Sequence, residues 1–393
     1  MSEWRECMLG ELVESISETY KFKPHEQVVF LNTSDILFGK VTNRLLQDSS
    51  NLPGQAKKRI TKGDLLFSEI RPANGRYAVI DFNAENYVVS TKLMVLRCND
   101  GIDKDYFRIF LTSEEQLDYL QLLAEDRSGT FPQITFDHIS SINISLPPLP
   151  EQKAIASVLS SLDDKIDLLH RQNKTLETMA ETLFRQWFVE EAGEDWEEVT
   201  LNDVTNRITD GAHASPATVE IGLPMASVKD MFEWGIKTES CRQISQNDYD
   251  ELIRTDCRPL KNDILIAKDG SYLKHVFVAE NDMDVVVLSS IAILRPNGKY
   301  HPLLLATFLK LDSTRESMEN IVTGAVIPRI VLKDFRNYKL LLPPKQIQEQ
   351  ALVAIEPLFK KCWENCRQIR TLEILRDTLL PKLMSGEVRV DYP

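Results

Sequence analysis

An internal repeat constrains the fold of this chain more than any other feature. The segment that begins at Trp4 starts again at Trp196, 192 residues later, and the turn after Arg59 returns after Arg258, 199 residues later. Further matches with similar offsets follow to the end of each copy: Ser128-Gly129 before Pro132-Gln133-Ile134 with Thr323-Gly324 before Pro328-Arg329-Ile330, Leu146-Pro147-Pro148 with Leu342-Pro343-Pro344, and Glu151-Gln152 with Glu349-Gln350. The chain is therefore a tandem duplication of a unit of about 145 residues followed by a long helix.

The first long helix is predicted from an apolar heptad pattern over residues 151–190. Apolar residues spaced alternately by three and four positions form a coiled-coil seam, and a single polar residue within it fixes the register. Here that polar residue is Asn173. The seam consists of Ile155, Leu159, Leu162, Ile166, Leu169, Asn173, Leu176, Ala180, Leu183 and Trp187.

A second helix over residues 346–385 is the one comparable partner. Ile355, Phe359 and Ile369 follow a heptad there, whereas Pro357 should bend the helix or delay its start. Because a compact domain usually has its ends close together, the first helix runs from unit one to unit two and the second runs back. The two helices are thus expected to form an antiparallel coiled coil with pseudo-two-fold symmetry.

The fold class expected is α+β, with two tandem mixed α/β domains separated by this helix pair. Within each copy, β-branched runs between Gly, Asn and Asp turns predict strands, and residues 107–123 and 303–319 predict short helices. The expected boundaries are 1–148 for the first domain, 149–192 for the first helix, 193–344 for the second domain and 345–393 for the second helix and tail.

The composition favours a cytoplasmic protein. The chain has 393 residues, 43% of them hydrophobic, and a net charge of −13. Its apolar runs are shorter than the roughly 20 residues that a membrane span needs, and the N-terminus lacks the features of a secretory signal. Six dispersed cysteines suit a reducing compartment.

Catalytic and metal sites are not expected. The sequence contains no GxxxxGK[ST] loop and no Gly-rich dinucleotide turn. Asp64, Glu69 and Arg71 resemble the spacing of a metal-dependent nuclease, but the repeat places Asp263, Lys268 and Gly270 there, so we expect a structural role. Cys362 and Cys366 fall on the helix seam and are expected to be small core residues rather than metal ligands.

Clusters of basic residues indicate nucleic-acid binding, despite the acidic chain. Residues 40–76 hold eight positive and three negative side chains, and residues 254–275 hold five and three. Clustered Lys and Arg neutralise phosphates, whereas Arg and Gln near turns can read base edges. The candidate DNA-binding residues are Lys57, Lys58, Arg59, Lys62, Arg71, Arg76, Arg127, Gln133, Arg254, Lys268, Tyr272, Lys274, His275 and Arg329. The candidate helix-interface residues are Leu162, Ile166, Leu169, Asn173, Leu176, Leu183, Trp187, Phe359 and Ile369.

The whole pattern resembles the specificity subunit of type I restriction–modification enzymes. The residues that carry the resemblance are the run 146–155 (LPPLPEQKAI) with Leu159, Leu162, Asp163 and Ile166, the start at Trp4, the turn 62–66 (KGDLL), Ser128-Gly129 before Pro132-Gln133-Ile134, and the run 379–387 (LLPKLMSGE). The resemblance implies two target recognition domains that each read half of an interrupted DNA sequence. It also implies two methyltransferase subunits and restriction subunits as partners, with S-adenosylmethionine, ATP and magnesium bound by those partners. The second copy departs from the family pattern, because Lys345-Gln346-Ile347-Gln348 precedes Glu349-Gln350. The resemblance therefore defines the start of the second helix only to within about two residues.

A second hypothesis stays open. The chain could be a coiled-coil protein-interaction scaffold whose globular units lack DNA specificity. A salt-dependent DNA shift in the presence of the partner subunits would separate the two hypotheses.

Overall fold

The structure is a computed structural model that describes residues 4–127, 132–270, 272–318, 322–323 and 329–391. The chain divides into two compact units, residues 1–165 with 372–393 and residues 166–371. Two long helices, α4 (Leu149–Arg185) and α9 (Lys345–Met384), each contribute to both units. Among the helices in the described ranges, none is long and apolar enough to span a membrane.

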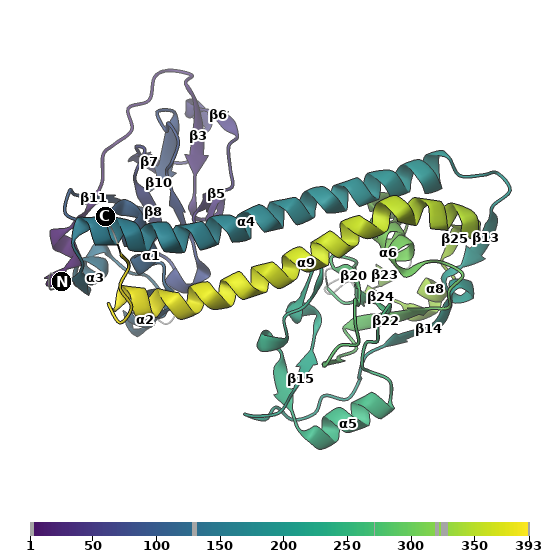
Figure 1. Ribbon diagram of the computed structural model, residues 1–393. Helices are drawn as coiled ribbons and strands as arrows, with labels where there is room; N and C mark the ends of the chain where they lie inside the picture. The colour runs from purple at the N-terminus through teal and green to yellow at the C-terminus, as the bar shows by residue number, and fades with distance from the viewer. Residues whose placement is uncertain (1–3, 128–131, 271, 319–321, 324–328, 392–393) are drawn as a thin grey trace. The chain divides into compact units, whose positions relative to one another are not determined.

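The first unit is built on two four-stranded sheets, with strand orders β2-β11-β8-β9 and β6-β3-β10-β7 (Figure 1). Helices flank the first of these sheets, and the short β1–β12 pair joins the beginning and end of the globular part. The elements are β1 Arg5–Met8, β2 Val13–Ile16, β3 Gln27–Leu31, β4 Ile36–Leu37, β5 Lys40–Val41, β6 Leu46–Asp48, β7 Ala56–Arg59, β8 Leu65–Ser68, β9 Tyr77–Val79, β10 Tyr87–Ser90, β11 Leu93–Cys98, α1 Lys104–Leu111, α2 Glu114–Arg127, α3 Phe136–Ser140 and β12 Asn143–Leu146.

The second unit repeats this plan with a four-stranded sheet β14-β22-β19-β20 and a three-stranded sheet β18-β15-β21. The pair β13–β25 closes it as β1–β12 closes the first unit. The elements are β13 Glu197–Thr200, β14 Thr205–Asp210, β15 Leu223–Ala226, β16 Met231–Phe232, β17 Gly235–Ile236, β18 Arg242–Ile244, α5 Gln246–Arg254, β19 Ile264–Ala267, β20 Val276–Val278, β21 Val286–Val287, β22 Ile291–Pro296, α6 Pro302–Lys310, α7 Asp312–Ser317, β23 Val322–Thr323, β24 Arg329–Ile330, α8 Leu332–Arg336 and β25 Lys339–Leu342.

The equivalent central strands β11 and β22 are buried because a separate hydrophobic core covers each face of their sheets. β11 lies between β2 and β8, and β22 lies between β14 and β19, so both are covered by neighbours on each edge. Leu93, Leu96, Ile291 and Leu294 on these strands are fully buried. A fully buried strand reads as a continuous apolar run, and this is why these segments were recognised from sequence.

The helix predicted over 107–123 is in fact two helices, α1 and α2, and the one over 303–319 begins as α6 and α7. A side chain caps the first helix of each pair. Asp103 accepts hydrogen bonds from the backbone of Asp105 and Tyr106, and His301 Nδ1 accepts from Leu303 N at 3.3 Å. Each cap satisfies amide groups that the helix start would leave unpaired.

A buried glutamine ties the start of each long helix to its own unit. Gln152 donates to Pro147 O at 2.9 Å and accepts from Asp103 N at 2.7 Å. Gln348 donates to Pro343 O at 2.9 Å and accepts from His301 N at 2.9 Å. The equivalent of Gln152 is therefore Gln348.

Two expectations about the second helix are corrected by this geometry. The match of Glu151-Gln152 with Glu349-Gln350 was wrong. It paired identical residues, but those of the second copy lie two positions beyond the true structural equivalents. The helix starts at Lys345, directly after the Pro-Pro pair, as the first starts at Leu149. It also runs through Pro357 without interruption, so the proline does not delay its start.

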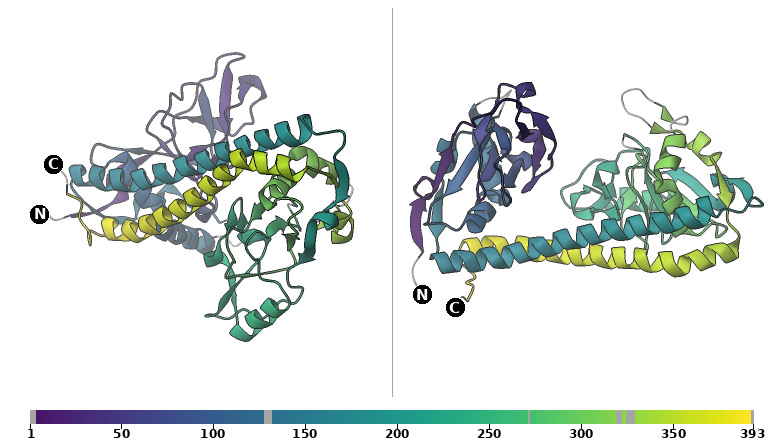
Figure 2. Two further views of the ribbon diagram at one scale, coloured as in Figure 1. Left: turned by 45° about the vertical axis from the view of Figure 1, so that its right-hand side comes forward. Right: turned by 90° about the horizontal axis from the view of Figure 1, so that it is seen from above.

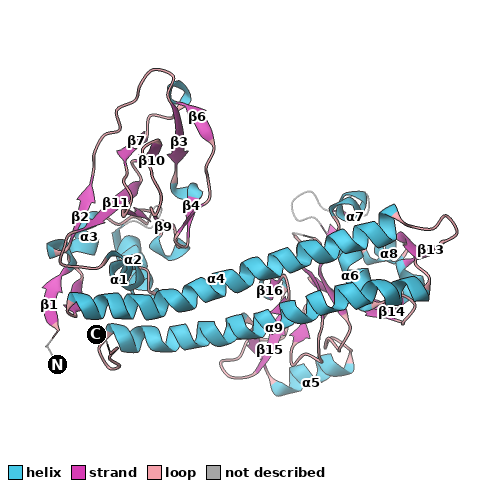
Figure 3. Ribbon diagram, turned by 45° about the horizontal axis from the view of Figure 1, so that its top comes forward, coloured by secondary structure: helices cyan, strands magenta, loops and turns pink. Residues whose placement is uncertain are grey.

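The two long helices run in opposite directions within each unit. In the second unit, Asn173 of α4 lies against Asn365 and Cys366 of α9. In the first unit, the start of α4 lies beside the end of α9 (Figure 3), and Arg376 Nη1 donates to Asp163 Oδ1 at 3.1 Å. Segments near the two ends of the chain also meet in the first unit, where Figure 2 shows the purple β1 and the yellow segment after α9 close to the start of α4. The indole of Trp4 and the guanidinium of Arg389 both bind the fully buried Glu151 there.

Candidate nucleic-acid interface

A buried aspartate–arginine pair stabilises the same turn in both units. Asp64 is 1% exposed and accepts from Arg97 Nε at 2.7 Å and Nη2 at 3.0 Å. Asp263, equally buried, accepts from Arg295 Nε at 2.9 Å and Nη2 at 2.8 Å. Hydrogen bonding to Asp64, opposed by burial, raises the pKa of the Arg97 guanidinium. The acidic residue of the apparent nuclease spacing is thus used in a structural ion pair.

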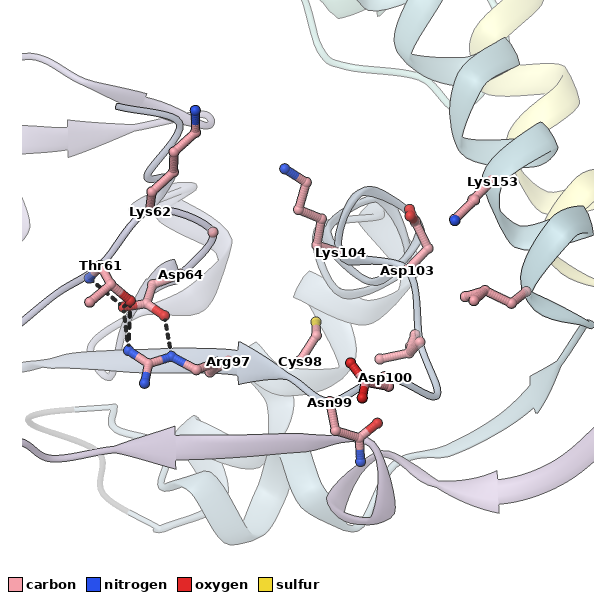
Figure 4. A pocket seen from close by; sticks show the side chains of 13 residues that line it. Thr61, Lys62, Asp64, Arg97, Cys98, Asn99, Asp100, Asp103, Lys104 and Lys153 are labelled. Atoms are coloured by element: carbon pink, nitrogen blue, oxygen red, sulfur yellow. Dashed lines mark hydrogen bonds and ion pairs between the residues drawn. The ribbon is translucent and has the colours of Figure 1, made fainter. Parts of the chain in front are cut away.

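A hollow of about 550 Å³ opens beside this pair in the first unit. Figure 4 shows Lys62, Lys104 and Lys153 around it, together with Asp100 and Asp103. The three lysines are exposed. Lys62 was predicted to bind DNA, and it lies on the rim of this hollow rather than beside Lys57 to Arg59.

The predicted cluster of Lys57, Lys58 and Arg59 lies on strand β7, where side chains alternate between faces. Lys57 and Arg59 are exposed. Lys58 is half-buried and donates from Nζ to Leu93 O at 2.8 Å, and burial lowers the pKa of its ammonium group. Lys57 and Arg59 therefore share a face that a phosphate can reach, whereas Lys58 points into the unit.

Two predicted residues come together at a β-bridge after strand β8. Ile70 pairs with Gln133, and Arg71 N donates to Pro132 O at 3.2 Å, so Arg71 and Gln133 are neighbours. Arg71 is exposed and has a positive φ of 48°. Arg76 is partly buried, and its Nη1 donates to the carbonyls of Ser34 and Ile36 at 3.3 Å, so it supports the β4–β5 hairpin.

In the second unit, Lys268 does not reach the surface. It is 5% exposed, and its Nζ lies 2.8 Å from Asp210 Oδ2. We therefore do not retain Lys268 as a residue that contacts a phosphate directly. The sequence could not show this, because the partner Asp210 is on a strand 58 positions earlier.

The remaining predicted residues of the second unit lie in different environments. Arg254 is exposed at the end of α5, so it is on a helix and not on an equivalent of β7. Lys274 is exposed, and Tyr272 lies under the guanidinium of Arg315 at 5.7 Å. His275 is largely buried, and its burial lowers the pKa of the imidazole although Glu233 raises it. Arg329 is exposed and pairs with Asp269.

Arg127 is the last residue of α2, and its side chain lies outside the described residues. Among the residues that are described, no group of three or more His, Cys, Asp or Glu side chains is placed to hold a metal ion. Cys362 is buried in the helix pair, where burial raises the pKa of its thiol to about 12.

The predicted seam of α4 is buried mainly in its first part, and Ala180 is its one buried member after Asn173. Ile166, Leu169 and Asn173 are buried, whereas Leu162, Leu176, Leu183 and Trp187 are half-buried. From Asn173 onward the buried positions are Glu177, Ala180, Phe184 and Phe188, and the last three of these pack in the core of the second unit. A straight helix drifts by about 20° per heptad, and this drift moves residues with strict seven-residue spacing away from the buried face.

On α9, Phe359 and Ile369 are buried, and Phe359 packs against Trp234 with ring centroids 5.5 Å apart. An ion pair also holds this helix to the bend that follows β20 in the second unit, with Arg367 bound to Glu280 at 2.6 Å. Sequence reasoning missed Glu177, Phe184 and Asn365. Asn365 carried no signal, because it lies off the heptad positions that define the α9 seam.

The fold and these sites define a protein made of two homologous α+β modules that share two long helices. A family model described as "Type I restriction modification DNA specificity domain" matches residues 1–178 and 193–373. The chain is 29% identical to the Type I restriction enzyme HindI specificity subunit of Haemophilus influenzae, across 99% of this chain and 100% of that protein. It is 28% identical to the MjaIX specificity subunit of Methanocaldococcus jannaschii, across 74% and 71% of the two chains.

A solved structure has the same fold. The type I restriction–modification S subunit from M. genitalium aligns over 97% of this chain and 96% of its own, with 18% identity and a TM-score of 0.58. This chain belongs to the family of type I restriction–modification DNA specificity subunits.

Proposed function

We propose that this chain is the DNA-recognition subunit of a type I restriction–modification complex, in which each unit reads one half of a bipartite target. One observation carries the proposal: two copies of one module present different polar side chains at the same position, the half-buried Gln133 in the first and the exposed Arg329 in the second. Two modules with one fold and different surface residues suit a target with two different halves. A duplex also has local two-fold symmetry, so two such modules can approach it equivalently.

The proposal gives the long helices the role of a spacer. They would form an antiparallel coiled coil with pseudo-two-fold symmetry and would dock two methyltransferase subunits, with restriction subunits in the larger complex. The HindI and MjaIX relatives are specificity subunits of type I restriction enzymes, and this supports the assignment of such partners. S-adenosylmethionine, ATP and magnesium would then be bound by the partners, the chain itself would be non-catalytic, and the complex would act in the cytoplasm.

Contact with the DNA backbone is expected to come from exposed cations such as Lys57, Arg59, Arg254 and Lys274. These contacts would make affinity depend strongly on salt without selecting sequence. The net charge of −13 means that binding must rely on these local positions.

Methylation mapping tests the proposal. A host genome that carries the chain with its methyltransferase partner should show one interrupted methylated motif, and this motif should vanish when the chain is deleted. A gel-shift titration against salt, with partners present, should show binding that weakens as salt rises. If the chain joined its partners but conferred neither a motif nor salt-dependent DNA binding, the scaffold hypothesis would replace this one.

A further inference from the structure

Gln133 and Arg329 occupy the same structural position in the two units. In the first unit, Ile70 pairs with Gln133 in a bridge, and Ile134 N donates to Glu69 O at 2.9 Å. In the second unit, Asp269 pairs with Arg329, and Ile330 N donates to Lys268 O at 3.2 Å. Both bridges lie two residues after an inner strand of the main sheet, β8 or β19.

A chain of alternating charges holds the Arg329 side chain in the second unit. Lys268 Nζ lies 2.8 Å from Asp210 Oδ2 and 3.9 Å from Asp269 Oδ1. Asp269 in turn accepts from Arg329 Nε at 3.2 Å and from Nη2 at 3.3 Å. The side chains of Lys268 and Asp269 are 6% and 17% exposed, whereas that of Arg329 is 60% exposed.

This arrangement fixes the plane of a guanidinium that still faces solvent. The Nε edge is occupied by Asp269, and at the far end of the guanidinium one Nη1 hydrogen and one Nη2 hydrogen remain available as a parallel pair of donors. Such a pair matches the O6 and N7 acceptors of guanine in the major groove. Immobilising arginine in advance also reduces the entropy that binding would otherwise lose.

The equivalent residue of the first unit has different chemistry. The Gln133 amide offers one donor and one acceptor together, and this combination matches the N7 acceptor and N6 donor of adenine. Position 70, the counterpart of Asp269, is isoleucine, which has no charge to orient an arginine. The two units therefore place different polar side chains at this position: arginine where the bridge partner is aspartate, and glutamine where it is isoleucine.

We propose that Arg329, positioned by Asp269, reads a guanine in the half-site of the second unit, and that Gln133 reads an adenine at the equivalent place in the half-site of the first. This inference rests on the proposed function. It goes beyond that function by assigning one base in each half-site to one side chain.

The test is methylation mapping of the chain assembled with its methyltransferase partner, using wild type, Arg329→Gln, Asp269→Asn and Gln133→Arg. Arg329→Gln should change the preference at one position of one half-site from guanine toward adenine, by roughly 5- to 150-fold in relative occupancy. Gln133→Arg should weaken the adenine preference at one position of the other half-site without giving a strong preference for guanine, because Ile70 has no carboxylate to orient the arginine. Asp269→Asn should weaken the guanine preference at the position that Arg329→Gln changes and leave the other half-site unaltered.

Arg254→Gln is the matched control, because Arg254 is exposed in the same unit and is expected to touch only phosphate. It should lower occupancy at all sites alike and leave the motif unchanged. A thermal melt of each variant shows whether it is folded, and Gln133→Arg tests the assignment even if Arg329→Gln does not fold.

The outcomes separate this inference from the function beneath it. If wild type gives an interrupted motif that Arg329→Gln and Gln133→Arg leave unchanged, the base assignment is wrong and the proposed function stands. A uniform loss for Arg329→Gln, like that of Arg254→Gln, would show that Arg329 contacts phosphate and would also overturn the assignment. If wild type gives no motif, the proposed function fails and the base assignment fails with it.

Discussion

Asn173 of α4 and Asn365 of α9 are hydrogen-bonded inside the helix pair, with Asn365 Nδ2 donating to Asn173 Oδ1 at 2.8 Å. Their exposed fractions are 4% and 0%. Asn365 also donates to Gln172 Oε1 at 3.0 Å, and Asn173 donates to Cys366 Sγ at 3.4 Å. A buried polar pair of this kind restricts a helix pair to the one register in which both partners meet.

Replacing one member of this pair should therefore be costly. Asn173→Leu leaves the Asn365 amide without its main partner, and the free energy of unfolding should fall by about 1–3 kcal/mol. The double variant Asn173→Leu with Asn365→Leu should recover most of this loss, because both polar groups are removed together. Urea denaturation of the four proteins in a double-mutant cycle gives the coupling.

The control for this cycle is Thr175→Ala, at an exposed position of the same helix, with an expected change within about 0.5 kcal/mol. Additive effects of the two leucine substitutions would contradict the proposed coupling between Asn173 and Asn365.

The alternation along β7 predicts different effects for adjacent basic residues. Changing Lys57 and Arg59 to Ala should weaken binding to all DNA sequences and lower the slope of log affinity against log salt by up to about 1.8, at roughly 0.9 per phosphate. Lys58→Met keeps the buried part of the side chain and should leave the slope unchanged, since Lys58 donates to Leu93 O. Equal slopes for the double variant and wild type would place β7 away from DNA.

Two histidines should make the second unit sensitive to acid. Burial lowers the pKa of His275 and His301, so the folded protein binds fewer protons at these groups than the unfolded chain does. Their contribution to stability is complete at pH values above the histidine pKa of the unfolded chain, near 6.5. It is lost as the pH falls from there toward the pKa of the folded protein. The loss is at most about 1.4 kcal/mol per pH unit for each histidine.

His275→Gln combined with His301→Asn should flatten this part of the profile, and asparagine can still cap α6. The measurement is the unfolding free energy at several pH values between 5 and 7.5, with His170→Gln on an exposed position of α4 as the control. A variant whose stability falls as steeply as that of wild type would assign the acid sensitivity to other groups.

The helices should act as a ruler for the gap between half-sites. Adding seven residues after Lys165 in α4 and seven after Thr371 in α9 keeps the heptad phase and leaves the packing within each unit intact. The insertion lengthens each helix by about 10 Å, and this corresponds to up to about three base pairs of duplex. Methylation mapping should then find the same two half-sequences with a longer spacer. Retained activity with an unchanged spacer would show that the helices do not set the gap.

The sequence predicted the duplicated α+β modules and the two long helices because these depend on local patterns: repeated segments, β-branched runs and apolar periodicity. It did not predict which basic residues are accessible. Lys58 and Lys268 looked like their neighbours, yet strand alternation turns the first inward and Asp210 neutralises the second. Whether a basic side chain is accessible therefore depends on partners that are distant in the sequence. The match of Gln152 with Gln350 failed for a similar reason, since only the hydrogen bonds of Gln348 identify the equivalent residue.

An exchange of one unit tests the central claim most directly. Residues 1–145 would be replaced by the corresponding unit of another family member, and the hybrid would be assembled with its methyltransferase partner for methylation mapping. One half of the motif should change to that of the donor, while the other half stays as in wild type. A motif in which both halves change together, or neither does, would contradict the conclusion that each unit reads its own half of the target.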